Sequence, residues 1–219
     1  MGRVAALFDL DKTLLDTSSG QLYARYTYRL GRMSRREMVR VTWWGFLSRL
    51  GMLHMENLIP RLLASAAGDD AQEMQELCDR WFVEDVLPHV AGRGMEQVAK
   101  HQAQGHVVAI VSASTQYVVR PMAAYLGIDG QYVCTHLENK DGQLTGAVIP
   151  PVCYGQGKVV WAEHFAAEHK VDLSSSYFYT DSISDLPLLE RVGYPVAVNP
   201  DPRLRRLALT RGWPIEKFY

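Results

Sequence analysis

The chain has 219 residues, of which 47% are hydrophobic and 21% are charged, and its formal net charge at pH 7 is −1. This composition is ordinary for a globular protein, and the near-neutral charge gives no electrostatic argument for binding to nucleic acid or to an acidic membrane. No apolar stretch approaches the length of a membrane span, and Cys78, Cys134 and Cys153 form no C-x-x-C pair. This cysteine pattern argues against a disulfide framework or a zinc site and fits a reducing cytoplasm.

The first predicted element carries two carboxylates at its end. The apolar run at residues 4–8 predicts a short buried strand, and Asp9 and Asp11 follow it. On an extended chain the side chains of residues i and i+2 point the same way, so both carboxylates can face one small volume. Two like charges that close persist only if a cation neutralises them or one keeps a proton. The pair indicates a magnesium site or an acid/base beside a nucleophile; the alternative is a strand cap with solvated aspartates.

The interval at residues 17–87 shows helical periodicity and no convincing strand. Serines, glycines and apolar spacing predict four helices within it. They are expected from Ser18 or Ser19 to Gly31, from about Ser34 to near Gly51, over 58–63, and after 68–70 through Trp81. This segment is therefore expected to be a helical insertion in a larger domain.

After Leu87 and Pro88 the pattern changes to alternating helices and strands, which predicts a doubly wound, parallel sheet. Strands are expected at 107–111, 176–180 and 196–198, with helices near 92–104, 115–126, 155–170 and from Pro202.

Polar side chains stand at the strand ends or helix starts of this region, namely Ser112, Lys158, Asp181 and Asp185. In open parallel sheets, ligands bind at the carboxyl ends of the strands. We therefore expect these side chains to converge with the first aspartate pair on a crevice that suits a phosphate and a divalent cation. Taken singly, each has a plainer interpretation: a strand terminator, a surface lysine, or a pair of capping acids.

With these residues assembled, the chain resembles the haloacid dehalogenase (HAD) superfamily over nearly its whole length, in particular its subfamily IB, which is phosphoserine-phosphatase-like and histidinol-phosphatase-like. The four motifs are matched in order by Asp9, Asp11 and Thr13, by Ser112, by Lys158, and by Asp181 and Asp185. Residues 140–146 are similar to a turn of that branch. The resemblance implies a Rossmann-like α/β core at 1–16 and 88–219, with an inserted helical-bundle cap at 17–87.

The resemblance also implies the chemistry of the aspartates. Asp9 would be the nucleophile that forms an aspartyl-phosphate, and Asp11 would be the general acid and then the general base. Mg²⁺ would be held by Asp9, the backbone carbonyl of Asp11, and Asp181. This set suits an ion that takes few carboxylates together with phosphate oxygens and water.

The remaining matched residues would serve the phosphate. Ser112, Ala113 and Lys158 would hold the phosphoryl oxygens, with their donors counting most in the transition state. Thr13 would tether the catalytic loop, and Asp185 would orient Lys158 or support the metal from outside its ligand shell.

The resemblance implies a magnesium-dependent phosphomonoesterase for a small phosphorylated metabolite, with histidinol phosphate as the preferred substrate. Phosphoserine phosphatases place a Glu nine residues after the nucleophile to grip the substrate amine; that position is Ser18 here, and Ser184 replaces an Asn. Tyr23, Trp43 or Trp44 could stack on an imidazole. Phosphoserine or another small metabolite is the alternative substrate, and a catalytically silent phospho-ligand-binding protein is the alternative class. The expected state is a cytoplasmic monomer or homodimer without nucleic-acid or membrane partners.

Overall fold

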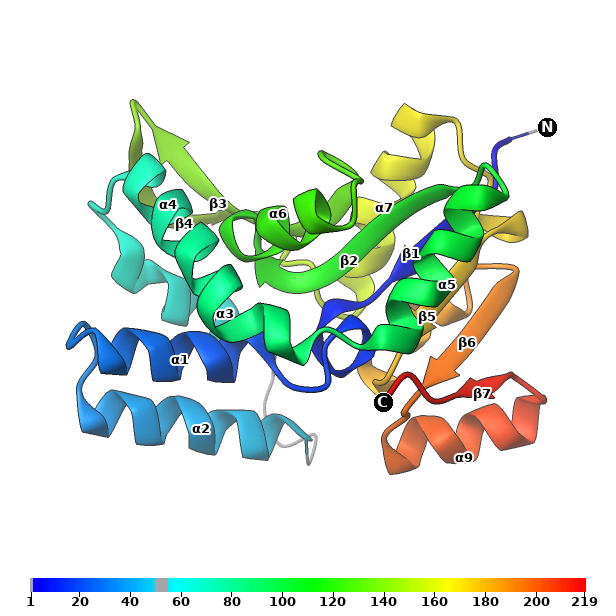
Figure 1. The fold of residues 1–219 in the computed structure, drawn as a ribbon, viewed down its shortest axis with the longest axis horizontal. Helices are drawn as coiled ribbons and strands as arrows, with labels where there is room; N and C mark the ends of the chain where they lie inside the picture. The colour runs from blue at the N-terminus through cyan, green and yellow to red at the C-terminus, as the bar shows by residue number, and fades with distance from the viewer. Residues whose placement is uncertain (1, 50–54) are drawn as a thin grey trace.

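A sheet of seven strands forms the centre of the protein in the computed structural model, which describes residues 2–49 and 55–219. The strands are Ala5–Phe8 (β1), Val107–Thr115 (β2), Tyr132–Lys140 (β3), Gln143–Ile149 (β4), Tyr177–Thr180 (β5), Tyr194–Val198 (β6) and Ile215–Glu216 (β7). Their order is β4-β3-β2-β1-β5-β6-β7 (Figure 1). All neighbouring pairs are parallel except β3 and β4, which form an antiparallel hairpin at one edge. The predicted doubly wound α/β fold is confirmed, although its sheet is mostly rather than wholly parallel.

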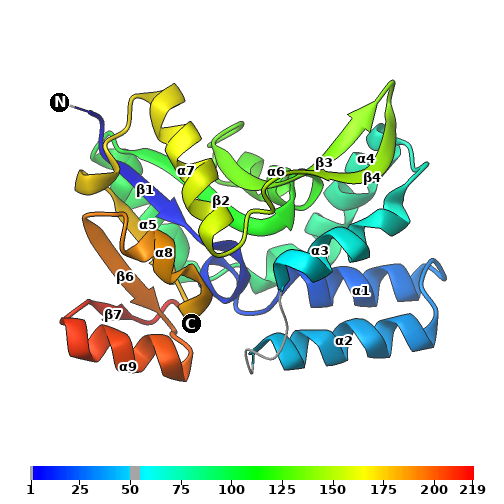
Figure 2. The same cartoon turned by 180° about the vertical axis from the view of Figure 1, so that it is seen from behind.

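Helices cover both faces of this sheet (Figures 1 and 2). They are Gly92–Ala103 (α5), Gln116–Tyr125 (α6), Gln156–His169 (α7), Leu186–Leu189 (α8) and Pro202–Arg211 (α9). Side chains of α5 and α6 share one hydrophobic cluster with the sheet, and side chains of α7, α8 and α9 share the other. The described helices fall short of the length and apolar character that crossing a lipid bilayer requires.

The central strands β1 and β2 contain continuous runs of apolar residues, because helices cover both of their faces. In β1, Ala6 and Phe8 pack in the cluster with α5 and α6, whereas Ala5 and Leu7 pack in the cluster with α7. Successive side chains of a strand point to opposite faces, so a strand buried on both sides needs apolar residues throughout. The carboxyl ends of β1, β2 and β5, which neighbour one another in parallel, therefore meet at one edge of a rigid core.

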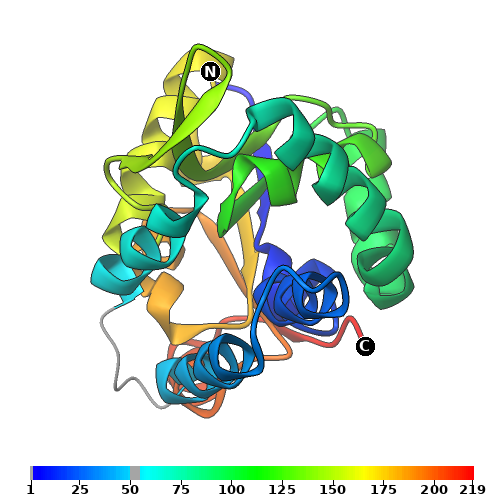
Figure 3. The ribbon, with the colours of Figure 1, turned by 90° about the vertical axis from the view of Figure 1, so that its left-hand side faces the viewer.

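In the described part of the interval between β1 and α5 there are four α-helices, as expected. They are Ser19–Arg29 (α1), Arg35–Arg49 (α2), Met55–Leu63 (α3) and Ala71–Trp81 (α4). The first two run antiparallel (Figure 1) and lie side by side (Figure 3). The end expected for the second helix, near Gly51, lies outside the described residues.

Part of this helical segment is packed into the core. Leu22 of α1 and Trp81 of α4 belong to the same buried cluster as Phe8. The turn before α4 is bonded to the β3–β4 hairpin, because the N–H of Gly68 donates to the carbonyl of Leu144 at 2.8 Å. The apolar packing of Leu22 and Trp81 and the backbone hydrogen bond to the hairpin fix α1 and α4 relative to the sheet. The division into a core at 1–16 and 88–219 and a cap at 17–87 stays a prediction.

Candidate active site

A loop after β1 places Asp9 and Asp11 at the carboxyl end of the sheet. Both aspartates have extended backbone (φ −66°, ψ 155° and φ −70°, ψ 124°), and Lys12 then turns the chain in a left-handed conformation (φ 56°, ψ 15°). Such a conformation is uncommon for a residue with a side chain. The N–H of Asp9 donates to the carbonyl of Tyr179 at 2.8 Å, which ties the loop to β5. The loop therefore brings the aspartates to the strand end that leads into Asp181.

Lys158 lies at the centre of the site between two carboxylates. Its Nζ is 2.7 Å from Asp9 Oδ1 and 2.7 Å from Asp185 Oδ2. Lys158, Asp9 and Asp185 are only 3%, 6% and 2% exposed. Thr180 Oγ1 donates to the same oxygen of Asp185 at 2.6 Å. A lysine in the first turn of a helix is usually a solvated residue, but this one is a buried ion-pair partner.

The start of α7 reaches this depth because Gly157 has no side chain. A Cβ at this position would lie 1.9 Å from the carbonyl oxygen of Val152, a distance that no packed structure tolerates. The glycine therefore allows the segment before α7 to lie directly against its first turn. Lys158, the next residue, is carried inward toward β1.

The charges of the site do not balance within the chain. Burial alone lowers the pKa of Lys158, but the charges of Asp185 and Asp9 raise it overall, so the ammonium stays protonated. Burial raises the pKa of Asp9 well above its ordinary value, and Lys158 only partly opposes this. Burial also raises the pKa of Asp181 to about 7, with Lys12 opposing and Asp185 adding. Several carboxylates thus share one buried ammonium, which leaves an excess of negative charge.

Asp11 is held by the start of α1 and linked to β2. The N–H of Ser19 donates to Asp11 Oδ1 at 2.6 Å, and the hydroxyls of Ser19 and Ser114 are 2.9 Å apart. The N–H of Ser114 in turn donates to Ser112 Oγ at 3.1 Å. Ser18 occupies the N-cap position of α1, but its side chain makes no capping bond. The carboxylate of Asp11 therefore supplies the cap that the sequence led us to expect from a serine.

Ser112, Ala113 and Thr13 also lie in or after the predicted strands, but Ser112 and Thr13 differ from the expectation. Ser112 is buried inside β2, which continues to Thr115, rather than at the end of the strand. The carbonyl of Ala113 accepts a hydrogen bond from Thr135 at 2.9 Å. Thr13 is buried, and its hydroxyl has no hydrogen-bond partner among the described residues, so the expected tether is not present as a hydrogen bond.

Two further residues belong to the site, although no role in it was predicted for them. Thr180 bonds Asp185, and Ser19 bonds Asp11. The signal for Thr180 was its place at the end of the strand that precedes Asp181. Ser19 was recognised only as a possible helix cap, since a contact with a residue eight positions earlier depends on how the loop turns.

The carboxylates of Asp9 and Asp181 are the side-chain donors available for Mg²⁺. Within the described ranges, no group of three or more His, Cys, Asp or Glu side chains is arranged to hold a metal ion. Magnesium does not require such a cage, because it keeps several waters and takes one or two carboxylates together with substrate phosphate. After burial and the opposing charge of Lys158, the charges of Asp185 and Asp181 add to the rise in the pKa of Asp9, so one ammonium faces several carboxylates. Two oxygen donors with excess negative charge fit this ion.

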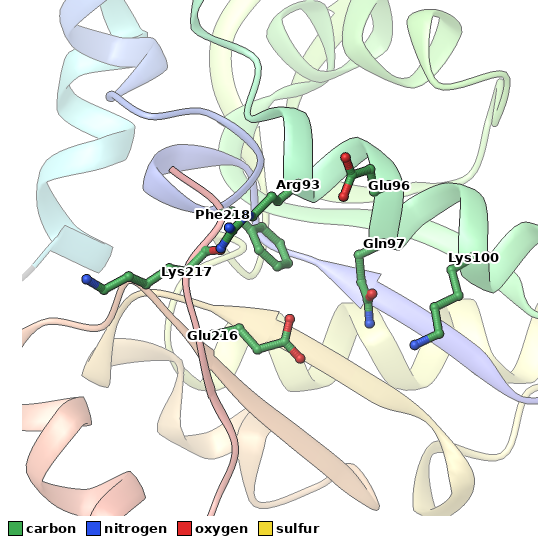
Figure 4. A pocket seen from close by; sticks show the side chains of 7 residues that line it. All are labelled: Arg93, Glu96, Gln97, Lys100, Glu216, Lys217 and Phe218. Carbon is green, nitrogen blue, oxygen red and sulfur yellow. The ribbon is translucent and has the colours of Figure 1, made fainter.

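A separate hollow of about 490 Å³ lies between α5 and β7 (Figure 4). It is lined by Arg93, Glu96, Gln97, Lys100, Glu216, Lys217 and Phe218. Its charged side chains are of both signs, and none of the predicted catalytic residues lines it. The candidate site is therefore the cluster around Lys158 rather than this surface hollow.

Curated relatives match almost the whole chain. A probable phosphatase of Mycobacterium tuberculosis is 35% identical over 99% of this chain and 76% of its own length. A histidinol-phosphatase of Neisseria meningitidis is 31% identical over 97% of this chain and 98% of its own. A phosphoserine phosphatase of M. tuberculosis is 30% identical over 98% of this chain and 70% of its own. The prediction of an enzyme of the phosphatase class is confirmed.

Solved structures agree with the fold. A protein of unknown function from Bordetella pertussis superposes with a TM-score of 0.90 at 31% identity, covering 100% of both chains. A phosphoserine phosphatase superposes with a TM-score of 0.72 at 20% identity over 100% of this chain and 95% of that one, a likeness that concerns the fold alone. The family model for haloacid dehalogenase-like hydrolases matches residues 6–190, from β1 to just after α8. The chain therefore belongs to the haloacid dehalogenase-like hydrolase family.

Proposed function

We propose that this enzyme hydrolyses a small phosphorylated metabolite in a magnesium-dependent reaction that passes through an aspartyl-phosphate on Asp9. The observation that carries the proposal is the buried ammonium of Lys158, 2.7 Å from both Asp9 and Asp185. A buried cation beside a carboxylate at the end of a parallel strand suits an anionic substrate. A silent binding protein would not need a nucleophile, an acid and a lysine all in place.

The nucleophile is Asp9. One of its oxygens is held by Lys158, so the carboxylate has a fixed orientation before any substrate arrives. Attack by a carboxylate oxygen on phosphorus forms a mixed anhydride and expels the alcohol. The same ammonium offers positive charge to the phosphoryl oxygens, and charge stabilisation is the main demand of phosphoryl transfer. Ser112 and Ala113, in the neighbouring strand, supply further contacts to the phosphoryl group.

The acid is Asp11. Burial raises the pKa of its carboxyl, which favours the protonated form that can donate to the leaving oxygen, while the bonds from Ser19 oppose this. In the second half of the reaction the ionised carboxylate takes a proton from the attacking water. The bond from the Ser19 N–H keeps the carboxyl in place for both steps.

The remaining roles concern charge and support. Asp9, the Asp11 carbonyl and Asp181 would hold Mg²⁺, which when bound neutralises charge on the phosphate. Asp185 orients Lys158 and is itself fixed by Thr180. The three cysteines are buried and form no disulfide, which supports a cytoplasmic location. We propose a monomer or a homodimer as the working state.

Metal dependence gives the first test. Excess chelator should abolish phosphatase activity and added Mg²⁺ should restore it, because the carboxylates otherwise repel the phosphate dianion. The Asp181→Ala variant should need at least about tenfold more Mg²⁺ for half-maximal rate, since a lost ligand weakens the site. Asp185→Ala serves as the comparison and should lower the rate with a smaller change in the Mg²⁺ requirement. Full activity in excess chelator would contradict the metal assignment.

Histidinol phosphate is the proposed substrate. The histidinol-phosphatase relative matches over 98% of its own length, whereas the phosphoserine phosphatase relative matches over 70%. Histidinol phosphate and phosphoserine both carry an amine, for which Ser18 offers no charge, so the choice between them falls to the imidazole of one and the carboxylate of the other.

The substrate test compares kcat/KM for histidinol phosphate, phosphoserine and a nucleoside monophosphate, each with Mg²⁺ present. We expect histidinol phosphate to exceed phosphoserine by at least about tenfold. A preference for phosphoserine by the same factor would overturn the substrate and leave the phosphatase assignment intact. Hydrolysis of none of a broad panel of phosphomonoesters would overturn the function itself.

A further inference from the structure

A carboxylate of the helical segment lies beside the start of the helix that carries Lys158. Gly155 is the N-cap residue of α7 and has a backbone conformation that side chains disfavour (φ 51°, ψ −120°). A Cβ at this position would lie 3.1 Å from Glu56 Oε1 on α3. Because Gly155 has no side chain, the carboxylate of Glu56 can lie directly beside the start of α7. Glu56 and Gly155 are therefore neighbours in space although they are far apart in the sequence.

This contact lies next to the ion-pair cluster of Lys158, Asp9 and Asp185. Tyr154 lies close enough to Ser184, which directly precedes Asp185 in the chain, for the Ser184 side chain to oppose the rise in its pKa. Burial raises the pKa of Tyr154, and the charges of Asp185 and of Glu56 both add to that rise. Glu56 and the ion pair of Lys158 and Asp185 therefore act on the same phenol. Glu56 itself is exposed to solvent.

The position of Glu56 is fixed by how α3 is anchored. Ile59, one turn further along α3, is buried. The chain just after α3 lies against β4, where a Cβ on Gly146 would come within 2.9 Å of the carbonyl oxygen of Ala64. A helix in contact with the hairpin by backbone as well as by side chains cannot move far without losing those contacts. Glu56 thus presents its charge from a defined place.

We infer that Glu56 is a specificity-determining residue that selects phosphomonoesters whose alcohol carries a cationic group over those whose alcohol carries a carboxylate. This inference rests on the proposed phosphatase function. With the phosphate end bound at Asp9 and Lys158, we place the alcohol end toward the start of α7, where Glu56 Oε1 borders Gly155. An exposed carboxylate attracts a cation weakly, because solvent and salt screen it, and one such contact corresponds to about a fivefold to tenfold preference.

The test uses three small phosphomonoesters of similar size: phosphoethanolamine, ethyl phosphate and phosphoglycolate. Their alcohols are cationic, neutral and anionic, and the neutral ester is the internal reference for every variant. In the wild-type enzyme we expect kcat/KM to fall in that order, by about fivefold to tenfold at each step at low ionic strength. Glu56→Gln should bring the cationic-to-neutral ratio close to one, and Glu56→Lys should invert it.

Glu73→Gln is the matched control, because Glu73 is an exposed glutamate on α4 and the chemical change is the same. It should retain the wild-type ratios. Raising the salt concentration should reduce the wild-type preference and leave the ratios of Glu56→Gln unchanged, since a charge effect is screened and a shape effect is not.

Two results would overturn the inference alone: unchanged ratios in Glu56→Gln, or an equal loss on all three esters, which would assign Glu56 a structural role. Equal wild-type rates on the three esters would have the same consequence. A wild-type enzyme that hydrolyses no phosphomonoester at all would instead remove the proposed function, and the inference with it.

Discussion

Asp9→Asn should lower kcat for phosphomonoester hydrolysis by at least about 10⁴-fold, because an amide cannot take the place of the attacking carboxylate. Asparagine has almost the same shape as aspartate, and its carbonyl oxygen can still accept the hydrogen bond from Lys158 Nζ that Asp9 Oδ1 accepts at 2.7 Å. The fold should therefore survive, and the far-ultraviolet circular dichroism and melting transition should stay cooperative. The measurement is a steady-state assay with Mg²⁺ in excess.

The matched control for this variant is Asp141→Asn. Asp141 is exposed in the turn between β3 and β4 and has a left-handed backbone (φ 52°), which asparagine tolerates well. The same chemical change at that position should leave the rate within about twofold of the wild type. If purified Asp9→Asn hydrolyses the substrate at the rate of this control, Asp9 is not the nucleophile.

The sequence predicted the four neighbouring parallel strands β2, β1, β5 and β6, because buried strands are visible as apolar runs, but it did not predict the two-residue strand β7. The hairpin of β3 and β4 was missed. β4 lies at the sheet edge with alternating exposed residues, and the last three residues of β3 are exposed, so their hydrophobic signal is weak, and only the turn at 140–146 was noted. The end of β2 was placed too early for a related reason. The apolar run stops at Val111, but pairing continues to Thr115, opposite Thr135.

The side chains proposed to act in catalysis could be predicted individually, whereas their hydrogen-bond partners could not. Asp9, Lys158 and Asp185 follow from strand ends and a helix start, and the structure places them in contact. The bond from Ser19 to Asp11 depends on the left-handed turn at Lys12, which no propensity rule predicts. The approach of Glu56 to Gly155 depends on how the helical segment packs on the hairpin, and a single sequence carries no direct signal for that.

Lys158→Met should impair both catalysis and stability, and the two losses have separable causes. Methionine keeps the length of the side chain but removes the charge, so Asp9 and Asp185 would remain buried without their shared cation. Removing one partner of a buried ion pair destabilises a protein by about 3–5 kcal/mol. Loss of the charge that stabilises the phosphoryl oxygens should lower kcat by at least about 10³-fold. Urea unfolding and a steady-state assay measure the two effects, with the exposed Lys100→Met as the control.

The double variant Lys158→Met, Asp185→Asn separates the two causes. Neutralising Asp185 removes one unpaired buried charge, so the double variant should recover part of the lost stability while its activity stays low. The sign of the pH dependence follows from Asp9, whose pKa is raised by burial and would rise further without Lys158. A carboxyl whose folded-state pKa is raised binds its proton more readily in the folded state, so stability increases as the pH falls through that value. The stability deficit of Lys158→Met should therefore shrink between neutrality and about pH 5. A deficit that is constant over this range would mean that lost packing, and not the unpaired carboxylates, destabilises the variant.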